Sequence, residues 1–247
     1  MNQTGNTILI TGGGSGIGRE LARRWHDLGN AVIVAGRREA ALAETAAGRA
    51  NMTTAVLDVE DAGRLADFAT RIVAEHPALN VLVNNAGIMR SEDVAAPRDL
   101  IDAEETIVTN LLAPIRLTNA LVGHLRTRAN AAIVTVTSGL AYVPLVSAPT
   151  YCATKAAIHS YTVSLRHQLR GQVEVIELIP PGVQTDLTPG QAIRDGYMPL
   201  DAFIDEVMTL FAQHPTPAEI AVKRVGFLRN AEVEGRFAQT LATLNPA

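Results

Sequence analysis

The chain has 247 residues, and its 21 Lys and Arg residues against 25 Asp and Glu residues give a formal net charge of −4. This length is typical of one large α/β domain, which needs neither a disulfide nor a structural metal to be stable. The lack of a basic cluster and the 4% aromatic content argue against a nucleic acid as the main partner. No stretch reaches the ~20 consecutive apolar residues of a membrane span, and the single cysteine, Cys152, favours a reducing compartment. We therefore expect a cytoplasmic protein that acts on a small molecule.

Short β-branched runs alternate with longer helical stretches from the N-terminus onward. The predicted strands are 7–11, 31–35, 52–57, 81–84, 132–137 and 173–179. The predicted helices are 16–28, 40–48, 62–76, 100–128 and 151–170, and Pro114 is expected to kink or break the fourth. Most strands are apolar on both alternating faces, which indicates parallel strands covered by helices on both sides. The order predicts an α/β fold, a doubly wound parallel sheet of the Rossmann type with three α/β/α layers, as a single domain over 1–247.

A glycine-rich loop, Thr11-Gly-Gly-Gly-Ser-Gly-Ile-Gly18, lies between the first predicted strand and the first helix. Glycines let the backbone turn tightly and approach a pyrophosphate at the helix N-terminus. Because the spacing G-x-x-x-G-x-G is a variant of the general dinucleotide fingerprint, a turn that merely permits close strand–helix packing is the alternative. The position of the loop favours dinucleotide binding. The expected cofactor contacts are Gly12, Gly14, Ser15, Gly16, Ile17 and Gly18.

The end of the second predicted strand bears on the choice of nicotinamide cofactor. An acidic residue at this point normally binds the ribose 2′-hydroxyl of NAD, but the sequence here is Gly36-Arg37-Arg38. A guanidinium can bind a 2′-phosphate through two hydrogen bonds, whereas two arginines that merely begin a solvated helix are the alternative. We expect Arg37 to contact the 2′-phosphate of NADP(H), with NAD(H) as the alternative cofactor.

Several short motifs follow one another in the order typical of short-chain dehydrogenases/reductases, and the chain strongly resembles that family over residues 4 to about 187. The motifs are Thr11-Gly12-x-x-x-Gly16-x-Gly18, Asp58-Val59, Asn84-Asn85-Ala86-Gly87, Asn110, Ser138, Tyr151-x-x-x-Lys155 and Pro181-Gly182-Val183-x-Thr185. The resemblance implies that Asp58, beside Val59, lies near the adenine and that Asn85, Ala86 and Gly87 flank the cofactor. It also implies that Pro181, Gly182, Val183 and Thr185 close over the nicotinamide. The family usually pairs subunits through the helices 100–128 and 151–170, which implies a homodimer or homotetramer.

Tyr151 and Lys155 lie four residues apart, so on a helix they share one face. The pKa of a free tyrosine is about 10, and a neighbouring ammonium is expected to lower it. Tyr151 can then exchange a proton with a carbonyl or an alcohol, while Ser138 polarises the substrate oxygen. The resemblance implies that Lys155 also binds the nicotinamide ribose, and that Asn110 distorts its helix and holds a water in a proton relay with Lys155. Each residue alone fits an ordinary packed or solvated position, but the combination favours catalysis.

The predicted function is hydride transfer between NADP(H) and a small carbonyl/alcohol substrate, with a non-catalytic dinucleotide-binding sensor as the alternative. The segment 139–150 carries no formal charge, and with a flexible lid at about 186–200 it is expected to line the substrate site; packing between these two segments is the alternative. The six histidines are dispersed, so we predict no metal site.

Two stretches near the C-terminus are more particular to this chain. Residues 180–191 are similar to a subgroup of short-chain oxidoreductases associated with D-alanylation of bacterial teichoic acids. Apolar residues recur at helical intervals over 219–235, where family members commonly have a short seventh strand. They are Ile220, Val222, Val225, Leu228 and Ala231. We therefore expect an atypical helical tail over about 200–247 in place of that strand.

Overall fold

A computed structural model describes residues 1–246 and contains one parallel sheet of seven strands. The strand order is β3-β2-β1-β4-β5-β6-β7, and it reverses between β1 and β4, as in a doubly wound fold. The strands are β1 (Thr7–Thr11), β2 (Ala31–Gly36), β3 (Met52–Val56), β4 (Val81–Asn84), β5 (Ala132–Val136), β6 (Glu174–Ile179) and β7 (Glu219–Ala221). The fold class predicted from the alternation of strands and helices is confirmed.

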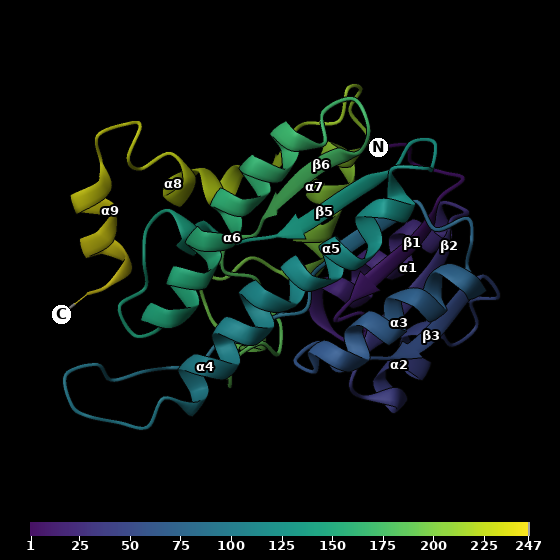
Figure 1. Cartoon of the computed structure of the whole chain (residues 1–247). Coiled ribbons are helices and arrows are strands. Elements are labelled where there is room, and N and C mark those ends of the chain that lie inside the picture. The colour runs from purple at the N-terminus through teal and green to yellow at the C-terminus, as the bar shows by residue number, and fades with distance from the viewer. Residues whose placement is uncertain (247) are drawn as a thin grey trace.

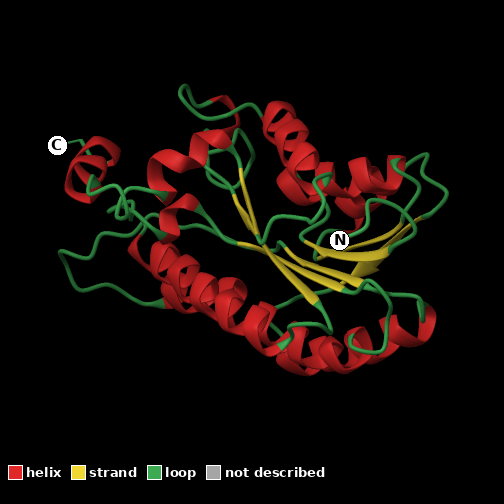
Figure 2. Ribbon diagram, turned by 90° about the horizontal axis from the view of Figure 1, so that it is seen from above, coloured by secondary structure: helices red, strands yellow, loops and turns green. Residues whose placement is uncertain are grey.

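Helices cover both faces of the sheet (Figure 2). They are α1 (Gly16–Asp27), α2 (Glu39–Ala46), α3 (Ala62–Glu75), α4 (Ile101–Ile107), α5 (Ala113–Leu125), α6 (Pro149–Gln168), α7 (Leu200–Phe211), α8 (Gly226–Arg229) and α9 (Phe237–Leu244). Strand alternation explains the two layers, because Ile8 and Ile10 of β1 pack into the core under α1 and α7, whereas Leu9 packs into the core under α3 and α5. Within residues 1–246, no helix has the length and apolar character needed to cross a membrane.

The long helix predicted over 100–128 is divided into three parts. A π-helical turn over Val108–Leu112 joins α4 to α5, and Pro114 lies in the first turn of α5. Pro114 has no N–H, so it cannot donate to the carbonyl of Asn110 four residues earlier. The result is a local distortion centred on Asn110.

The tail prediction was wrong about the seventh strand. Residues Glu219–Ala221 form β7, which pairs in parallel with β6 through Leu178 and Ile220. The apolar residues that suggested a helix also fit the two-residue spacing of a strand. Ile220 and Val222, two residues apart, both pack into the core beside α7. Helical structure begins only at Lys223 and continues into α8, and Figure 1 shows α8 and α9 beyond the end of the sheet.

Candidate active site

The carboxyl ends of the central strands surround two adjoining cavities, at the place where ligands bind in a doubly wound fold. The first cavity, of about 190 Å³, lies over β2 and β3, and the second, of about 380 Å³, extends to α6 and to the segment after β6. They share Gly12, Ser15, Arg37, Arg38, Ala86, Gly87 and Ile88. Together they form one elongated cleft, which suits an extended ligand such as a dinucleotide.

The glycine-rich loop lies between the two cavities and has no room for side chains at three of its positions, Gly12, Gly13 and Gly18. Gly12 has a positive φ of 68°, and a Cβ built there would lie 2.8 Å from Nδ2 of Asn85. A Cβ at Gly18 would collide with the same amide and with the Gly12 carbonyl. Asn85 Nδ2 donates to the carbonyls of Thr11 (2.9 Å) and Gly12 (3.3 Å), which joins the loop to the end of β4. The loop thus presents bare backbone at the start of α1, a cradle that fits a pyrophosphate.

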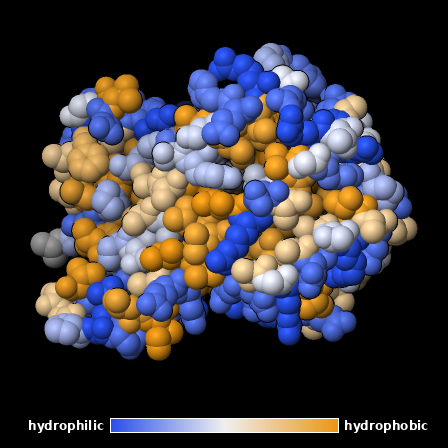
Figure 3. Space-filling model, in the orientation of Figure 1, coloured by the Kyte–Doolittle hydropathy of each residue, from blue (hydrophilic) through white to orange (hydrophobic). Residues whose placement is uncertain are grey.

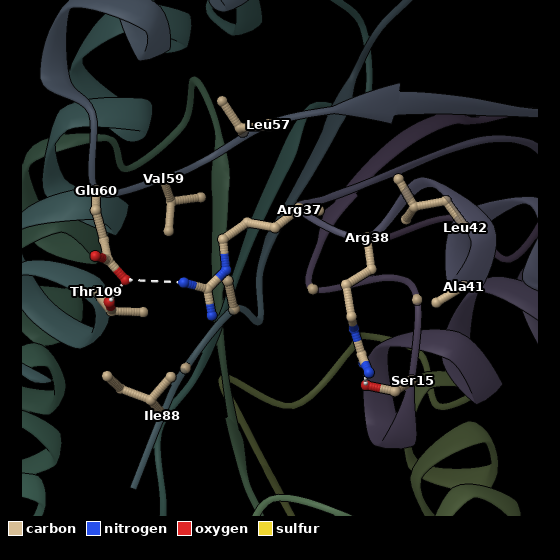
Figure 4. A pocket seen from close by; sticks show the side chains of 15 residues that line it. Ser15, Arg37, Arg38, Ala41, Leu42, Leu57, Val59, Glu60, Ile88 and Thr109 are labelled. Atoms are coloured by element: carbon tan, nitrogen blue, oxygen red, sulfur yellow. Dashed lines mark hydrogen bonds and ion pairs between the residues drawn. The ribbon is translucent and has the colours of Figure 1, made fainter. Parts of the chain in front are cut away.

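Two arginines at the end of β2 reach across the first cavity in different directions (Figure 4). Arg38 Nη2 lies 3.3 Å from Oγ of Ser15 in the glycine-rich loop. Arg37 Nη1 lies 3.5 Å from Oε1 of Glu60, and the same oxygen accepts a 2.8 Å hydrogen bond from Thr109. Both guanidinium groups are placed to meet an anion in the cleft.

The catalytic residues predicted on β5 and α6 meet at one wall of the second cavity. Ser138 follows β5, and Tyr151 and Lys155 lie on the inner face of α6; only 7% of Ser138, 7% of Tyr151 and 5% of Lys155 is exposed. Lys155 Nζ donates to the carbonyl of Val136 at 2.9 Å and lies 5.6 Å from the centre of the Tyr151 ring. These side chains are therefore held in place by burial.

Asn110 lies behind this wall, in the π-helical turn. Its side chain bonds both backbone groups of Ile88: Nδ2 donates to the carbonyl at 2.8 Å, and Oδ1 accepts from the N–H at 2.9 Å. Gly87 permits this approach, since a Cβ there would lie 3.2 Å from Asn110 Oδ1 and 3.8 Å from Lys155 Nζ. Asn110 thus ties the helix to the chain that follows β4.

The segment after β6 covers the second cavity from the other side. Pro181, Val183 and Thr185 line it, and Gln191 Nε2 donates to the Val183 carbonyl (2.8 Å) and to Thr185 Oγ1 (3.1 Å). The loop predicted as a lid is closed at its base by a parallel bridge between Val183 and Met198.

Four of the predicted site residues do not line either cavity. Gly18 and Gly182 make room for neighbours, and a Cβ added at Gly182 would lie 3.1 Å from the ring of Tyr197. Asn110 acts from behind the wall, as described above. Asp58 accepts a hydrogen bond from the backbone N–H of Glu60 (3.1 Å) and faces a separate surface hollow.

The sequence of residues 6–194 matches the model of the family described as short chain dehydrogenase. The protein belongs to this family. Short-chain dehydrogenases are oxidoreductases that use a nicotinamide dinucleotide, and the cradle at Gly12 and Gly18 fits such a cofactor.

Relatives of this short-chain dehydrogenase include oxidoreductases of similar length. The chain is 44% identical over 236 residues to the uncharacterized oxidoreductase DltE of Bacillus subtilis (strain 168), covering 94% of this chain and 93% of that protein. It is 33% identical over 245 residues to sulfoacetaldehyde reductase 2 of Chromohalobacter salexigens, covering 94% and 97%. The closed form of serine dehydrogenase complexed with NADP+ superposes with a TM-score of 0.76 at 26% identity, covering 86% and 90%. The similarity to DltE confirms the subgroup resemblance found in residues 180–191.

Burial shifts the pKa values of Tyr151 and Lys155, which with Ser138 form the wall of the second cavity that we call the catalytic wall. Desolvation raises the pKa of Tyr151, and a hydrogen bond to Ser138 acts in the opposite direction. Desolvation lowers the pKa of Lys155 to about 8. We expected Lys155 to lower the pKa of Tyr151. In the structure the pKa of Tyr151 is raised instead, because the effect of burial is larger than that of the neighbouring groups.

Sequence patterns missed several polar contributors to the site. Glu60 and Thr109 bond each other beside Arg37, and Thr154 accepts a 3.3 Å hydrogen bond from Asn110. Glu60 lies two residues after Asp58, and Thr109 directly precedes Asn110. The closeness of both residues to motif residues was the only feature of the sequence that could have indicated their place in the site. Arg38, treated as equivalent to a solvated helix residue, lines both cavities.

Proposed function

We propose that the protein is an NADP(H)-dependent oxidoreductase that interconverts a small carbonyl compound and its alcohol. The observation that carries this proposal is the grouping of Ser138, Tyr151 and Lys155 on one wall of the second cavity, with the glycine-rich loop at the other end of the cleft. The nicotinamide, when bound, supplies or accepts the hydride. The chain itself moves the proton and orients the substrate oxygen.

Tyr151 is the general acid in reduction and the general base in oxidation. In reduction its hydroxyl donates a proton to the carbonyl oxygen while the carbonyl carbon gains the hydride, and the alcohol is formed. Ser138 donates a hydrogen bond to the same oxygen and so stabilises the charge that develops there. Burial raises the pKa of Tyr151, so the phenol is protonated near neutral pH, as the proton donor in reduction must be. Lys155, with Asn110 behind it, would return a proton to Tyr151 and would bind the nicotinamide ribose when the cofactor is present.

Arg37 and Arg38 support NADP(H) over NAD(H). The end of β2 offers glycine and two guanidinium groups, where an acidic side chain would repel a 2′-phosphate. The serine dehydrogenase structure that resembles this chain is complexed with NADP+. The backbone of the glycine-rich loop would hold the pyrophosphate, with Ala86, Gly87 and Val183 beside the remainder of the cofactor.

The lining beyond Tyr151 favours a substrate without negative charge. The segment after β6 lines the second cavity with Pro180, Pro181, Leu187 and Gln191, and Asp186 is the only charged side chain that this segment contributes. Arg194, in the lid, is stacked 5.2 Å over the ring of Tyr197 and does not line the cavity. Sulfoacetaldehyde, named for a relative, is anionic, and this segment contributes no cation to the cavity that would bind its charge. We therefore propose a neutral carbonyl compound.

Tyr151→Phe tests the proposal, with Tyr161→Phe on the same helix as the matched control. NADPH oxidation is first screened over neutral aldehydes and ketones to find a substrate. Tyr151→Phe is then expected to lower kcat by about 10²- to 10⁴-fold, because it removes the proton donor. NADPH binding, followed by fluorescence, stays within about threefold, and Tyr161→Phe keeps full activity. Equal turnover by the wild type and Tyr151→Phe would favour the non-catalytic sensor.

The assembly and location belong to the same proposal. Figure 3 shows apolar side chains gathered across the face where α4, α5 and α6 lie, and Ile101 and Ile107 of α4 are exposed there. This supports a homodimer or homotetramer paired through these helices. The buried free thiol of Cys152 is consistent with a cytoplasmic protein.

A further inference from the structure

A fully buried carboxylate lies beneath the catalytic wall. Glu177 of β6 has no exposed surface, and such a group is tolerated only when it is paired. Its Oε1 accepts a 2.7 Å hydrogen bond from Thr137, and both of its oxygens lie 2.9 Å from Nδ1 of His159. Tyr142 also reaches Oε1, at 3.4 Å. Glu177 lines neither cavity of the cleft, so the proposed reaction does not use it directly.

His159 connects this carboxylate to the catalytic helix. It lies four residues after Lys155 and eight after Tyr151 on α6, which places all three on the same side of the helix. A carboxylate only accepts hydrogen bonds, so the Nδ1 atom of His159 that faces Glu177 must carry a proton. Among residues 1–246, His159, whose side chain is one-quarter exposed, is the only basic side chain within ion-pair distance of Glu177.

Thr137 connects the same carboxylate to the proposed catalytic serine. Thr137 immediately precedes Ser138, and its hydroxyl forms the shortest contact to Glu177. The backbone on both sides of Ser138 is also tied to β6 and the segment after it: Thr137 N–H donates to the Leu178 carbonyl and Gly139 N–H to the Pro180 carbonyl, each at 2.9 Å. Because Thr137 and Ser138 are consecutive, anchoring Thr137 holds the backbone from which the Ser138 side chain projects, and Ser138 Oγ itself accepts a 3.1 Å hydrogen bond from the Leu140 N–H.

The C-terminal segment from β7 to α8 packs against Tyr142, at the other end of the contacts made by Glu177. Arg229 of α8 lies 4.5 Å over the ring of Tyr142 and forms two 2.9 Å hydrogen bonds to Glu219 of β7. A Cβ at Gly139 would lie 2.8 Å from side-chain atoms of both Leu228 and Val225, so the tail packs directly on the loop that begins at Ser138. The loop is therefore held from the sheet side by Glu177 and from the outside by the tail.

We propose that Glu177 and His159 are positioning residues that hold Ser138, through Thr137, in the orientation that meets the substrate oxygen. This proposal rests on the proposed function, since Ser138 must itself contribute to catalysis. Glu177 accepts a hydrogen bond from the Thr137 hydroxyl, and His159 and Tyr142 provide further donors to its oxygens in the buried interior. The expected signature is a loss in kcat with cofactor binding unchanged, because the substrate oxygen needs Ser138 most in the transition state.

A double-mutant cycle between Glu177 and Ser138 tests this proposal. Glu177→Gln keeps the shape of the side chain and removes its charge, and it is expected to lower kcat about tenfold with the Kd for NADPH unchanged within about twofold. In the Ser138→Ala background the same substitution should cost less than about twofold, because the group that it positions is already absent. Equal costs in the two backgrounds would overturn the proposal, since Glu177 would then act independently of Ser138.

His159 provides a second series that does not alter the buried carboxylate. His159→Asn keeps a donor close to the position of Nδ1, whereas His159→Leu removes it, so most of the activity lost in His159→Leu should return in His159→Asn. His167→Leu on the exposed side of α6 is the control and keeps full activity. Equal losses in the Asn and Leu variants would contradict the positioning role, and the series also decides the question if Glu177→Gln does not fold. A wild-type kcat in Ser138→Ala would instead refute the role of Ser138 in the proposed function.

Discussion

The two walls of the cleft are built from different materials. The cofactor wall consists mainly of backbone, with glycines at the closest approaches and two arginines at its outer end; the Arg37 side chain is 57% exposed. The catalytic wall consists of side chains, and both Tyr151 and Lys155 are more than nine-tenths buried. Cofactor binding at the first wall should therefore depend on the space that the glycines leave free. Catalysis at the second wall should depend on the environment of its buried polar side chains.

Burial shifts the pKa values of Tyr151 and Lys155 on the catalytic wall. Removing a charge from water disfavours its charged form, and this lowers the pKa of Lys155 to about 8 while it raises the pKa of Tyr151. On the cofactor wall, solvent screens the guanidinium groups, so each contact there is expected to contribute less. Substitutions should thus have their largest effects on the catalytic wall.

After Tyr151→Phe, the substitution Lys155→Met should show the largest effect. Removal of the ammonium is expected to lower kcat by about 10²- to 10³-fold, because the proton relay and the charge beside Tyr151 are lost together. In the wild type the ammonium form of Lys155 is lost as the pH rises through about 8, so activity should decline above that pH. The measurement is kcat/KM between pH 6 and 10, with Lys223→Met as the matched control.

The sequence allows the pKa of Lys155 to be measured directly. Lys155 and Lys223 are the only lysines in the chain, so isotope-labelled lysine gives two side-chain NMR signals, and Lys223→Arg assigns them. The Lys155 signal should titrate near pH 8. A Lys155 signal that titrates near the ordinary lysine value of about 10.4 would show that the catalytic wall is more hydrated than its burial indicates.

Gly18→Ala, on the cofactor wall, should show the next largest effect. The added Cβ meets Asn85 and the backbone of Gly12, so the loop must move away from the position that cradles the pyrophosphate. We expect NADPH to bind about 10²-fold more weakly, with kcat at saturating NADPH reduced far less. Gly123→Ala in α5, where a Cβ would meet no atom within 4 Å, is the matched control, because both glycines lie in helices and neither has a positive φ. A loss that appears only in kcat would contradict the division between the two walls.

Sequence motifs predicted the cofactor wall better than the support behind the catalytic wall. Gly12, Arg37, Ser138, Tyr151 and Lys155 lie where the motif order indicated, because each follows a strand or shares a helix face with another motif residue. Contacts that join distant segments carry no such local signal.

The contacts of the tail illustrate this limit. Glu219 and Arg229 pair across β7 and α8, and Glu177 reaches Thr137 from a different strand. The three-residue strand β7 was missed because the spacing of Ile220 and Val222 also fits a longer helical pattern. The direction of the Tyr151 pKa was missed because burial cannot be obtained from the four-residue spacing alone.

Arg37→Ala should have the smallest of these effects and the most selective. Its exposed guanidinium is proposed to bind the 2′-phosphate, so the Kd for NADPH should rise about tenfold at low salt while the Kd for NADH changes less than about twofold. Arg38→Ala loses the 3.3 Å contact to Ser15 Oγ and should raise the Kd for NADPH less, because the 2′-phosphate is assigned to Arg37. Binding of both cofactors is measured by fluorescence at two salt concentrations. Parallel losses for NADPH and NADH in Arg37→Ala would show that this end of the cofactor wall, like the glycine-rich loop, acts through shape rather than charge.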